Sequence, residues 1–159
     1  MDNINREYID SYINSLIQDE EEQLNIFRNE CIERQLTIIH KEVGQLIKLI
    51  IKQHNAKNII EVGTNVGYSA IFMSHVMNNE GRIVTMERSE KFYLEALENI
   101  ERFKLEKNIE IHFGDAVDIL DNLKGSFDIA FIDAAKSYYT VFFDKCAKMM
   151  SSGGIIISD

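Results

Sequence analysis

The 159-residue sequence predicts one α/β domain built on a doubly wound parallel sheet. After His54, five short β-rich segments alternate with helical segments, which is the pattern of strands joined by crossover helices. Acidic residues also end the five predicted strands, and these are Glu61, Glu87, Asp115, Asp133 and Asp159. Because ligands bind beyond the carboxyl ends of parallel strands, we expect these acids to surround a binding site.

Residues 1–54 are expected to form an N-terminal helical segment that packs on the core. A first helix has one apolar stripe, formed by Tyr8, Tyr12, Ile13, Leu16 and Ile17. A second helix is expected over residues 19–34, with acidic residues in its first turn. A third helix should follow Thr37, a possible N-cap, and its apolar face is formed by Ile39, Val43, Leu46, Ile47 and Ile50.

Residues 55–159 are expected to form the sheet and its covering helices. The predicted strands are NIIEV, RIVTME, IEIHFGD, FDIAFID and GGIIISD. The predicted helices are YSAIFMSHVM, Glu90–Phe103, AVDILDNL and Tyr138–Met150. In the usual strand order of such sheets, GGIIISD is an open apolar edge, which favours pairing with another chain.

The composition favours a folded, acidic, cytoplasmic protein. Its formal net charge of −9 argues against a nucleic-acid footprint over the whole surface, although a local basic patch stays possible. Two cysteines without a CxxC pattern are typical of a reduced cytosolic protein. The polar N-terminus and the absence of an apolar run of about 18 residues predict no membrane segment.

The segment EVGTNVGYSA predicts the ligand of the first strand–helix junction. Gly63 and Gly67 are spaced G-x-x-x-G, which differs from the G-x-G-x-x-G pattern of pyrophosphate-binding loops. The carboxylate of Glu61 would repel phosphates there but would attract an ammonium or sulfonium group. Glu87 suits a ribose diol in either kind of site. Together these residues predict S-adenosylmethionine and disfavour an NAD-dependent oxidoreductase.

Four motifs extend this interpretation to a family. EVGTNVGYSA, IVTMER, HFGDA and FDIAFIDAAKSYY, in this order, resemble the divalent-cation-dependent O-methyltransferases related to catechol and caffeoyl-CoA methyltransferases. The resemblance extends from roughly Ile38 to Asp159 and implies a Rossmann-like class I methyltransferase fold. The N-terminal YIDSYINSLI is similar to a bacterial branch that methylates 5-hydroxyuridine at the wobble position of tRNA.

The resemblance implies a role for each candidate site residue. Glu61 and Gly63 would line the methionine part of the cofactor, with Ser69 at its carboxylate, Glu87 at the ribose, and Asp115 and Ala116 at the adenine. Gly67 and Asp133 would also be cofactor-binding residues. Asp133 and Asp159 would bind Mg²⁺ or another divalent cation. Lys136 would be the catalytic base, and Asp133 would count with it as a catalytic residue. Plainer alternatives stay open: Ser69 and Asp115 as helix caps, and Asp133 with Lys136 as a structural ion pair.

The implied reaction is O-methylation, and three outcomes are open. The favoured acceptor is 5-hydroxyuridine in tRNA, the alternative acceptor is a small catechol-like phenol, and a third possibility is a cofactor-binding fragment without catalysis. In the family, an Asn ligand and two further strands follow the position of Asp159. We therefore expect a C-terminally truncated chain that lacks the last two strands, from a family whose full-length members are homodimers.

Overall fold

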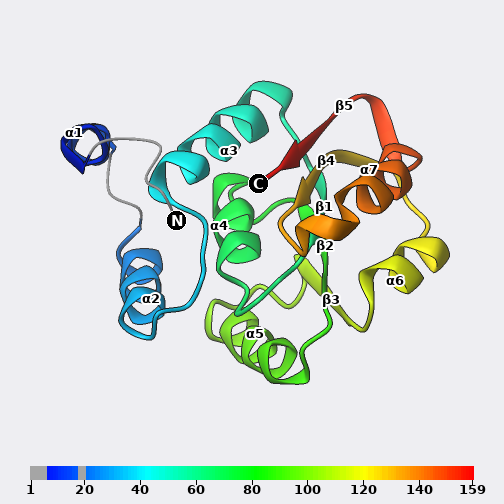
Figure 1. The fold of residues 1–159 in the computed structure, drawn as a ribbon, viewed down its shortest axis with the longest axis horizontal. Helices are drawn as coiled ribbons and strands as arrows, with labels where there is room; N and C mark the ends of the chain where they lie inside the picture. The colour runs from blue at the N-terminus through cyan, green and yellow to red at the C-terminus, as the bar shows by residue number, and fades with distance from the viewer. Residues whose placement is uncertain (1–6, 18–20) are drawn as a thin grey trace.

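The computed structural model describes residues 7–17 and 21–159. Helices and strands alternate after the N-terminal helices (Figure 1). The helices are α1 (Glu7–Leu16), α2 (Glu22–Glu33), α3 (Lys41–His54), α4 (Tyr68–Val76), α5 (Glu90–Arg102), α6 (Ala116–Asn122) and α7 (Tyr139–Ala147), with a 3₁₀ turn η1 (Lys136–Tyr138). The strands are β1 (Asn58–Val62), β2 (Arg82–Glu87), β3 (Ile109–Phe113), β4 (Phe127–Ile132) and β5 (Met150–Ser158).

The five strands form one parallel sheet in the order β3-β2-β1-β4-β5. The chain builds the sheet outward from β1 to β3, then crosses back to place β4 on the other side of β1. The direction of winding therefore changes between β1 and β4, where ligands bind in sheets of this kind. The doubly wound sheet is confirmed, and β5 is an edge strand, as the sequence predicts.

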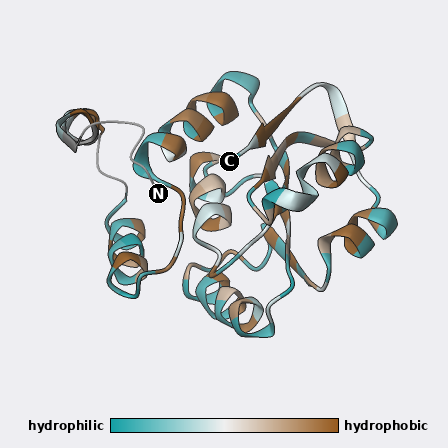
Figure 2. Cartoon of the chain, viewed as in Figure 1, coloured by the Kyte–Doolittle hydropathy of each residue, from teal (hydrophilic) through white to brown (hydrophobic). Residues whose placement is uncertain are grey.

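Two hydrophobic clusters cover the two faces of the sheet. Neighbouring residues of a strand point to opposite faces, so Ile59 belongs to the cluster with α3, α4 and α5, whereas Ile60 belongs to the cluster with α6 and α7. Figure 1 shows the two groups of helices on either side of the sheet. Figure 2 shows hydrophobic residues along the central strands and polar residues on the outer turns of the helices.

The N-terminal helices differ in how far they join this core. Phe27 of α2 and Ile47 of α3 are buried in the same cluster as α4. The stripe of α1 forms the expected helix, but Tyr8, Tyr12 and Leu16 are each about two-thirds exposed. The predicted acids Asp19 and Glu20 lie outside the described residues. Within the described ranges, no helix has both the length and the apolar character that a bilayer span requires.

The start and the inner face of α3 differ from the prediction. The helix begins at Lys41 with His40 in the N-cap position, so Thr37 is not its N-cap. Gly44 brings the helix close to the Phe72 ring of α4, because a Cβ there would lie 3.4 Å from Phe72 Cζ. This contact turns Ile51 inward and leaves Leu46 more than half exposed, contrary to the predicted face.

The predicted helix at Tyr138–Met150 is too long at its C-terminal end. The helix α7 stops at Ala147, and Met150 already pairs with Phe127 as the first residue of β5. A shift of register follows between Phe127 and Ile129, opposite the glycine pair of β5. Pairing with β4 therefore outweighs the helical tendency of the two methionines.

Candidate functional site

The loop between β1 and α4 depends on two glycines. Gly63 has φ +98°, and a Cβ there would lie 2.0 Å from the carbonyl oxygen of Asp133. Gly67 has φ +87° and occupies the N-cap position of α4. Only glycine adopts both backbone conformations at low cost. The first glycine therefore allows the end of β1 to lie directly against the end of β4.

A cavity of about 440 Å³ lies at the carboxyl ends of the strands. Its volume is within the range of small-molecule sites. The structure places six predicted site residues in its lining: Gly63, Ser69, Glu87, Asp115, Ala116 and Asp133. The remaining predicted residues, Glu61, Gly67, Lys136 and Asp159, lie outside that lining.

Glu61 lies behind the wall of the cavity, so the expectation that it lines the cavity is wrong. Its side chain is fully buried because its position in β1 puts it on the same face of the sheet as Ile59, which α3, α4 and α5 cover. Its Oε2 accepts a hydrogen bond of 2.6 Å from Thr85, whereas Oε1 has no partner among the described residues. Burial raises the pKa of Glu61 to about 8, against the opposing effect of the Ser69 and Thr85 hydroxyls.

A second threonine extends this buried contact into the loop. The hydroxyl oxygens of Thr64 and Thr85 are 2.5 Å apart. When Glu61 is ionised, Thr85 donates its only hydroxyl proton to Glu61, and Thr64 is then the donor to Thr85. When Glu61 is protonated, its O–H can donate to Thr85, and Thr85 can donate to Thr64. Neither threonine is among the predicted site residues, although a hydroxyl residue in the middle of the apolar strand RIVTME was a usable signal.

Two backbone amides orient the carboxylate of Glu87. Asn65 N–H donates to Oε2 at 2.8 Å, and Ser89 N–H donates to Oε1 at 2.7 Å. A carboxylate has about four acceptor positions, so each oxygen keeps one for a ligand. The geometry therefore suits the predicted contact with the two hydroxyls of a ribose.

The cap alternatives for Ser69 and Asp115 have different outcomes. Asp115 caps α6, since its Oδ1 accepts a 2.8 Å hydrogen bond from Val117 N–H, and it also lines the cavity. Ser69 is not a helix cap: Gly67 holds that position in α4, without a side-chain bond. The Ser69 side chain is thus not committed to capping.

The segment between α2 and α3 forms part of the same wall. Thr37 and Ile38 line the cavity, and the Thr37 carbonyl accepts a 2.9 Å hydrogen bond from Asn65 Nδ2. The Asn65 Oδ1 atom is buried without a partner among the described residues. This contact was not predicted from the sequence, because it joins residues 28 positions apart and no local sequence pattern indicates it.

The acidic pair Asp133 and Asp159 follows two neighbouring strands. Ile132 and Ser158 are paired in the sheet, so the next residues emerge side by side. Burial and the negative charge of Asp159 raise the pKa of Asp133, whereas the Lys136 ammonium acts in the opposite direction. The Tyr139 hydroxyl donates to the Asp159 carbonyl oxygen. Lys136 itself is exposed at the start of η1.

The acidic pair has the donor chemistry that Mg²⁺ prefers. Carboxylate oxygens are its usual protein ligands, and one or two of them with several waters are sufficient. Mutual repulsion between Asp133 and Asp159 would be relieved by a dication. Over residues 7–17 and 21–159, however, no group of three or more His, Cys, Asp or Glu side chains is placed to hold a metal.

Comparisons of sequence place the chain among known methyltransferases. A family model described as O-methyltransferase matches residues 14–159. The catechol O-methyltransferase of Niastella koreensis is 35% identical over 159 residues, covering 96% of this chain and 72% of that protein. Caffeoyl-CoA O-methyltransferase 2 of Petunia hybrida is 32% identical over 119 residues, 71% of this chain, and the match spans 49% of the relative's length.

Solved structures of two methyltransferases share the fold. The O-methyltransferase from Bacillus cereus, in complex with SAH, has a TM-score of 0.84 and 32% identity, over 96% of this chain and 72% of that one. The O-methyltransferase of tomaymycin synthesis from Streptomyces achromogenes, in complex with SAM, has a TM-score of 0.83 and 29% identity, over 96% and 71%. The chain therefore belongs to the family of S-adenosylmethionine-dependent O-methyltransferases.

Proposed function

We propose that this chain binds S-adenosylmethionine in the 440 Å³ cavity and transfers its methyl group to an acidic hydroxyl of a small catechol-like phenol. The observation that carries the proposal is the continuity of one cavity. The glycine loop, the oriented carboxylate of Glu87 and the carboxyl group of Asp133 all lie in its lining. A donor and an acceptor bound there would be neighbours.

The cofactor half of the site would bind by hydrogen bonds and charge. Glu87 would offer two oxygen atoms to a ribose diol, and Asp115 with Ala116, which also line the cavity, would frame the adenine. Ser69, whose side chain does not cap α4, would donate to the carboxylate of the methionine part. The buried carboxyl of Glu61 would attract the ammonium group of the same part once it is ionised, and a bound ammonium group would itself favour that ionisation.

The acceptor half would activate a hydroxyl group. A divalent cation held by Asp133 and Asp159 would supply a positive charge that lowers the pKa of the acceptor hydroxyl. Lys136, three residues after Asp133, would take the hydroxyl proton as the neutral amine. The phenol oxygen then forms its bond to the methyl carbon as the carbon–sulfur bond breaks. Methyl transfer requires these two atoms about 3 Å apart and in line with the sulfur.

A small phenol is the acceptor that the surroundings favour. The cavity lining includes Ile38, Tyr138 and Phe142, which suit an aromatic ring. The relative with 35% identity is named a catechol O-methyltransferase. The net charge of −9 does not favour RNA.

The second candidate, 5-hydroxyuridine in tRNA, rests on the N-terminal YIDSYINSLI, most of which forms α1. A cytoplasmic location and a homodimer belong to the same proposal.

Calorimetric titration of S-adenosylmethionine into the 159-residue chain tests the cofactor part of the proposal. We expect micromolar binding, tighter than that of NAD, and an unfolding temperature that rises with cofactor. Absence of heat from a folded chain would contradict the proposal. Transfer of a labelled methyl group to catechol and to bulk tRNA, with Mg²⁺ or with EDTA, then tests the acceptor. Labelled tRNA with unlabelled catechol would favour the second candidate.

A further inference from the structure

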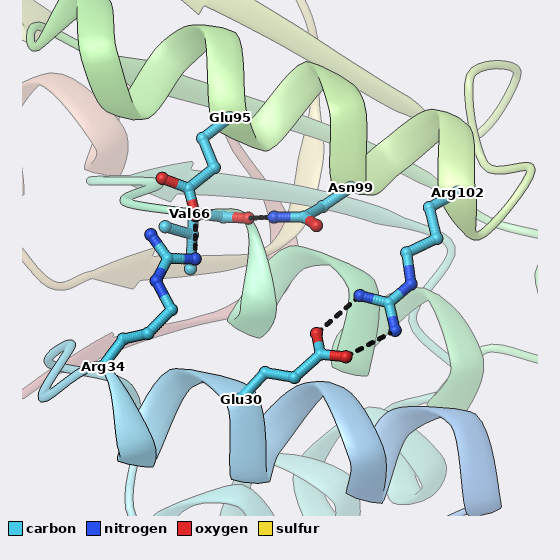
Figure 3. Close-up of polar contacts among 6 residues, drawn as sticks. All are labelled: Glu30, Arg34, Val66, Glu95, Asn99 and Arg102. Atoms are coloured by element: carbon cyan, nitrogen blue, oxygen red, sulfur yellow. Dashed lines mark hydrogen bonds and ion pairs between the residues drawn. The ribbon is translucent and has the colours of Figure 1, made fainter.

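One face of α5 contacts both the glycine loop and α2. Glu95, Asn99 and Arg102 are spaced i, i+4 and i+7, so they lie on the same side of the helix. Figure 3 shows Asn99 directed at the loop, with Glu95 and Arg102 on either side of it reaching toward α2. The helix also begins beside the cavity, where Ser89 and Phe92 contribute to the lining.

Asn99 holds the backbone of the glycine loop. Its Nδ2 atom donates a 2.9 Å hydrogen bond to the carbonyl oxygen of Val66. The next residue, Gly67, lies close to Ala96, because a Cβ built on Gly67 would be 3.5 Å from Ala96 Cβ. The helix thus meets the loop at two consecutive residues, once through a hydrogen bond and once through close packing.

The loop is held on its other side by the cavity residue Glu87. Asn65 N–H donates to Glu87, while the next residue, Val66, accepts from Asn99. The backbone of these two residues is therefore fixed between the end of β2 and the face of α5. Gly67 N–H, in the same peptide unit as the Val66 carbonyl, donates a 2.9 Å hydrogen bond to the Thr64 carbonyl, which is in the same peptide unit as the Asn65 amide. Movement of the Val66 carbonyl would therefore disturb the Asn65 amide and weaken one of the two backbone bonds that Glu87 accepts.

Two ion pairs fix the position of α5 relative to α2. Arg102 donates to both oxygens of Glu30, at 2.6 and 2.9 Å, and Arg34 pairs with Glu95 (Figure 3). Exposed ion pairs each contribute little to stability. The bidentate geometry of Arg102 nevertheless sets an orientation, and the pairs lie on both sides of Asn99 along the helix.

We propose that Asn99 is a positioning residue of the cofactor site, which acts by fixing the Val66 carbonyl so that Asn65 keeps Glu87 oriented. The role rests on the proposed binding of S-adenosylmethionine. It requires a donor at this position, because the group that Asn99 faces is a carbonyl oxygen. A carboxylate of the same shape in its place would repel that oxygen, and an alanine would leave it without this partner.

The chain offers a matched control in Asn108. Its Nδ2 atom also donates to loop carbonyls, those of Asn79 and Gly81, at 2.7 and 3.0 Å. These bonds lie at the start of β2 and β3, which is the opposite end of the sheet from the cavity. Asn99→Asp and Asn108→Asp remove the same donors and add the same charge.

The test measures affinity for S-adenosylhomocysteine by calorimetry, together with the unfolding temperature. We expect about a tenfold weaker affinity in Asn99→Asp, because the variant loses the one hydrogen bond from residue 99 that orients the loop. In Asn108→Asp we expect less than a twofold change, with a similar or larger loss of stability. Asn99→Ala, which adds no charge, should weaken binding as well. Equal affinity in all three variants and the wild type would overturn the role of Asn99.

Amide hydrogen exchange without any ligand separates this inference from the proposed function. If Asn99 positions the loop, the amides of residues 64–67 exchange faster in Asn99→Asp and Asn99→Ala than in Asn108→Asp. A wild-type chain that does not bind S-adenosylhomocysteine would contradict the proposed function. The exchange rates would then still show whether Asn99 fixes the loop over residues 64–67. Unchanged exchange at residues 64–67 would show that the contact is dispensable and would overturn the inference.

Discussion

The two halves of the candidate site are built in different ways. In the loop after β1, Thr64 and Val66 are almost fully buried, and side chains of β2 and α5 hold the loop in place. After β4, in contrast, Lys136 and Tyr138 are exposed. A shared cofactor needs one rigid geometry, whereas acceptors differ in shape. In this chain, buried contacts and hydrogen bonds therefore fix the cofactor half of the site, whereas the acceptor half is less constrained by its surroundings.

The acidic side chains of the two halves also differ in how completely the protein buries them. Glu61 is fully buried, so desolvation dominates its pKa. Asp133 is partly buried, and its neighbours Asp159 and Lys136 act on its pKa in opposite directions. Changes in the cofactor half should therefore alter folding and binding together, whereas changes in the acceptor half should alter metal response or turnover and leave folding nearly intact.

Gly63→Ala should have the largest effect on stability. The added Cβ would collide with the Asp133 carbonyl oxygen at 2.0 Å, and alanine would be strained at the φ of +98° that this position requires. We expect a loss of about 3 kcal/mol or more, because strain and overlap each cost about 1–3 kcal/mol. Denaturant unfolding measures the loss, and calorimetry should show no cofactor binding.

Gly153→Ala is the matched control for that change. Gly153 also has a positive φ, +82°, but no described atom lies within 4 Å of the position of its Cβ. Only backbone strain is expected, about 1 kcal/mol. Equal losses for the two variants would contradict the importance of the close approach between β1 and β4.

Glu61→Gln should have an effect of similar size, and its sign depends on pH. The folded chain keeps the Glu61 proton up to a pKa of about 8, whereas the unfolded chain releases it near 4.5. Wild-type stability should therefore be greatest below pH 4.5, as far as this group is concerned, and should fall as pH rises toward 8. The two pKa values differ by about 3.5 units, so the full loss is on the order of 5 kcal/mol at about 1.4 kcal/mol per unit.

The glutamine variant should not show the fall in stability that ionisation of Glu61 causes between pH 4.5 and 8. It should be more stable than the wild type at pH 8 without cofactor, yet bind S-adenosylmethionine more weakly, since an amide attracts the ammonium group less. Thermal unfolding between pH 5 and 8 and calorimetry measure the two effects. The same pH slope in both proteins would show that Glu61 ionises normally.

The sequence predicted the cofactor half better than the rest because its signals are local. The parallel sheet, the loop and the strand-end acids follow from alternation of strands and from glycine spacing within short segments. Thr64, Thr85 and Asn99 were missed because each acts through a partner on another element. Their side chains look ordinary until the fold brings β1, β2 and α5 together.

The errors in the helices have a similar origin. Thr37 has the chemistry of an N-cap, but the chain before α3 stays irregular so that its carbonyl can accept from Asn65 in the loop. Met150 favours a helix locally, yet pairing with Phe127 starts β5 there. In both places, a contact with a distant residue outweighs the local preference, and single-sequence reasoning has no access to that contact.

Asp133→Asn should affect the response to Mg²⁺ more than stability. Mg²⁺ should raise the unfolding temperature of the wild type, by about 1.4 kcal/mol of stabilisation when its concentration is ten times its dissociation constant. The variant should lose most of this response because only Asp159 of the pair keeps its charge. Exposed Asp118→Asn is the control, measured at matched ionic strength. An undiminished response in Asp133→Asn would place the cation elsewhere.

Lys136→Ala should have the smallest effect on stability. The side chain is exposed, and surface substitutions usually change stability by no more than about 0.5 kcal/mol. Cofactor affinity should also be unchanged, since Lys136 is not in the lining of the cavity. Methyl transfer to catechol should fall by a factor of about 10² or more if Lys136 is the general base.

The same variant decides between the two interpretations of Lys136. A structural ion pair with Asp133 predicts a lower unfolding temperature and little loss of turnover at saturating substrate, whereas a catalytic base predicts the reverse. Exposed Lys148→Ala controls for the loss of one positive charge. The acceptor half is the less constrained half of the site, so Lys136→Ala should cost little stability. A large loss of stability would show that Lys136 does not belong to the less constrained half. The lysine would then belong to the framework that fixes the carboxyl end of β4.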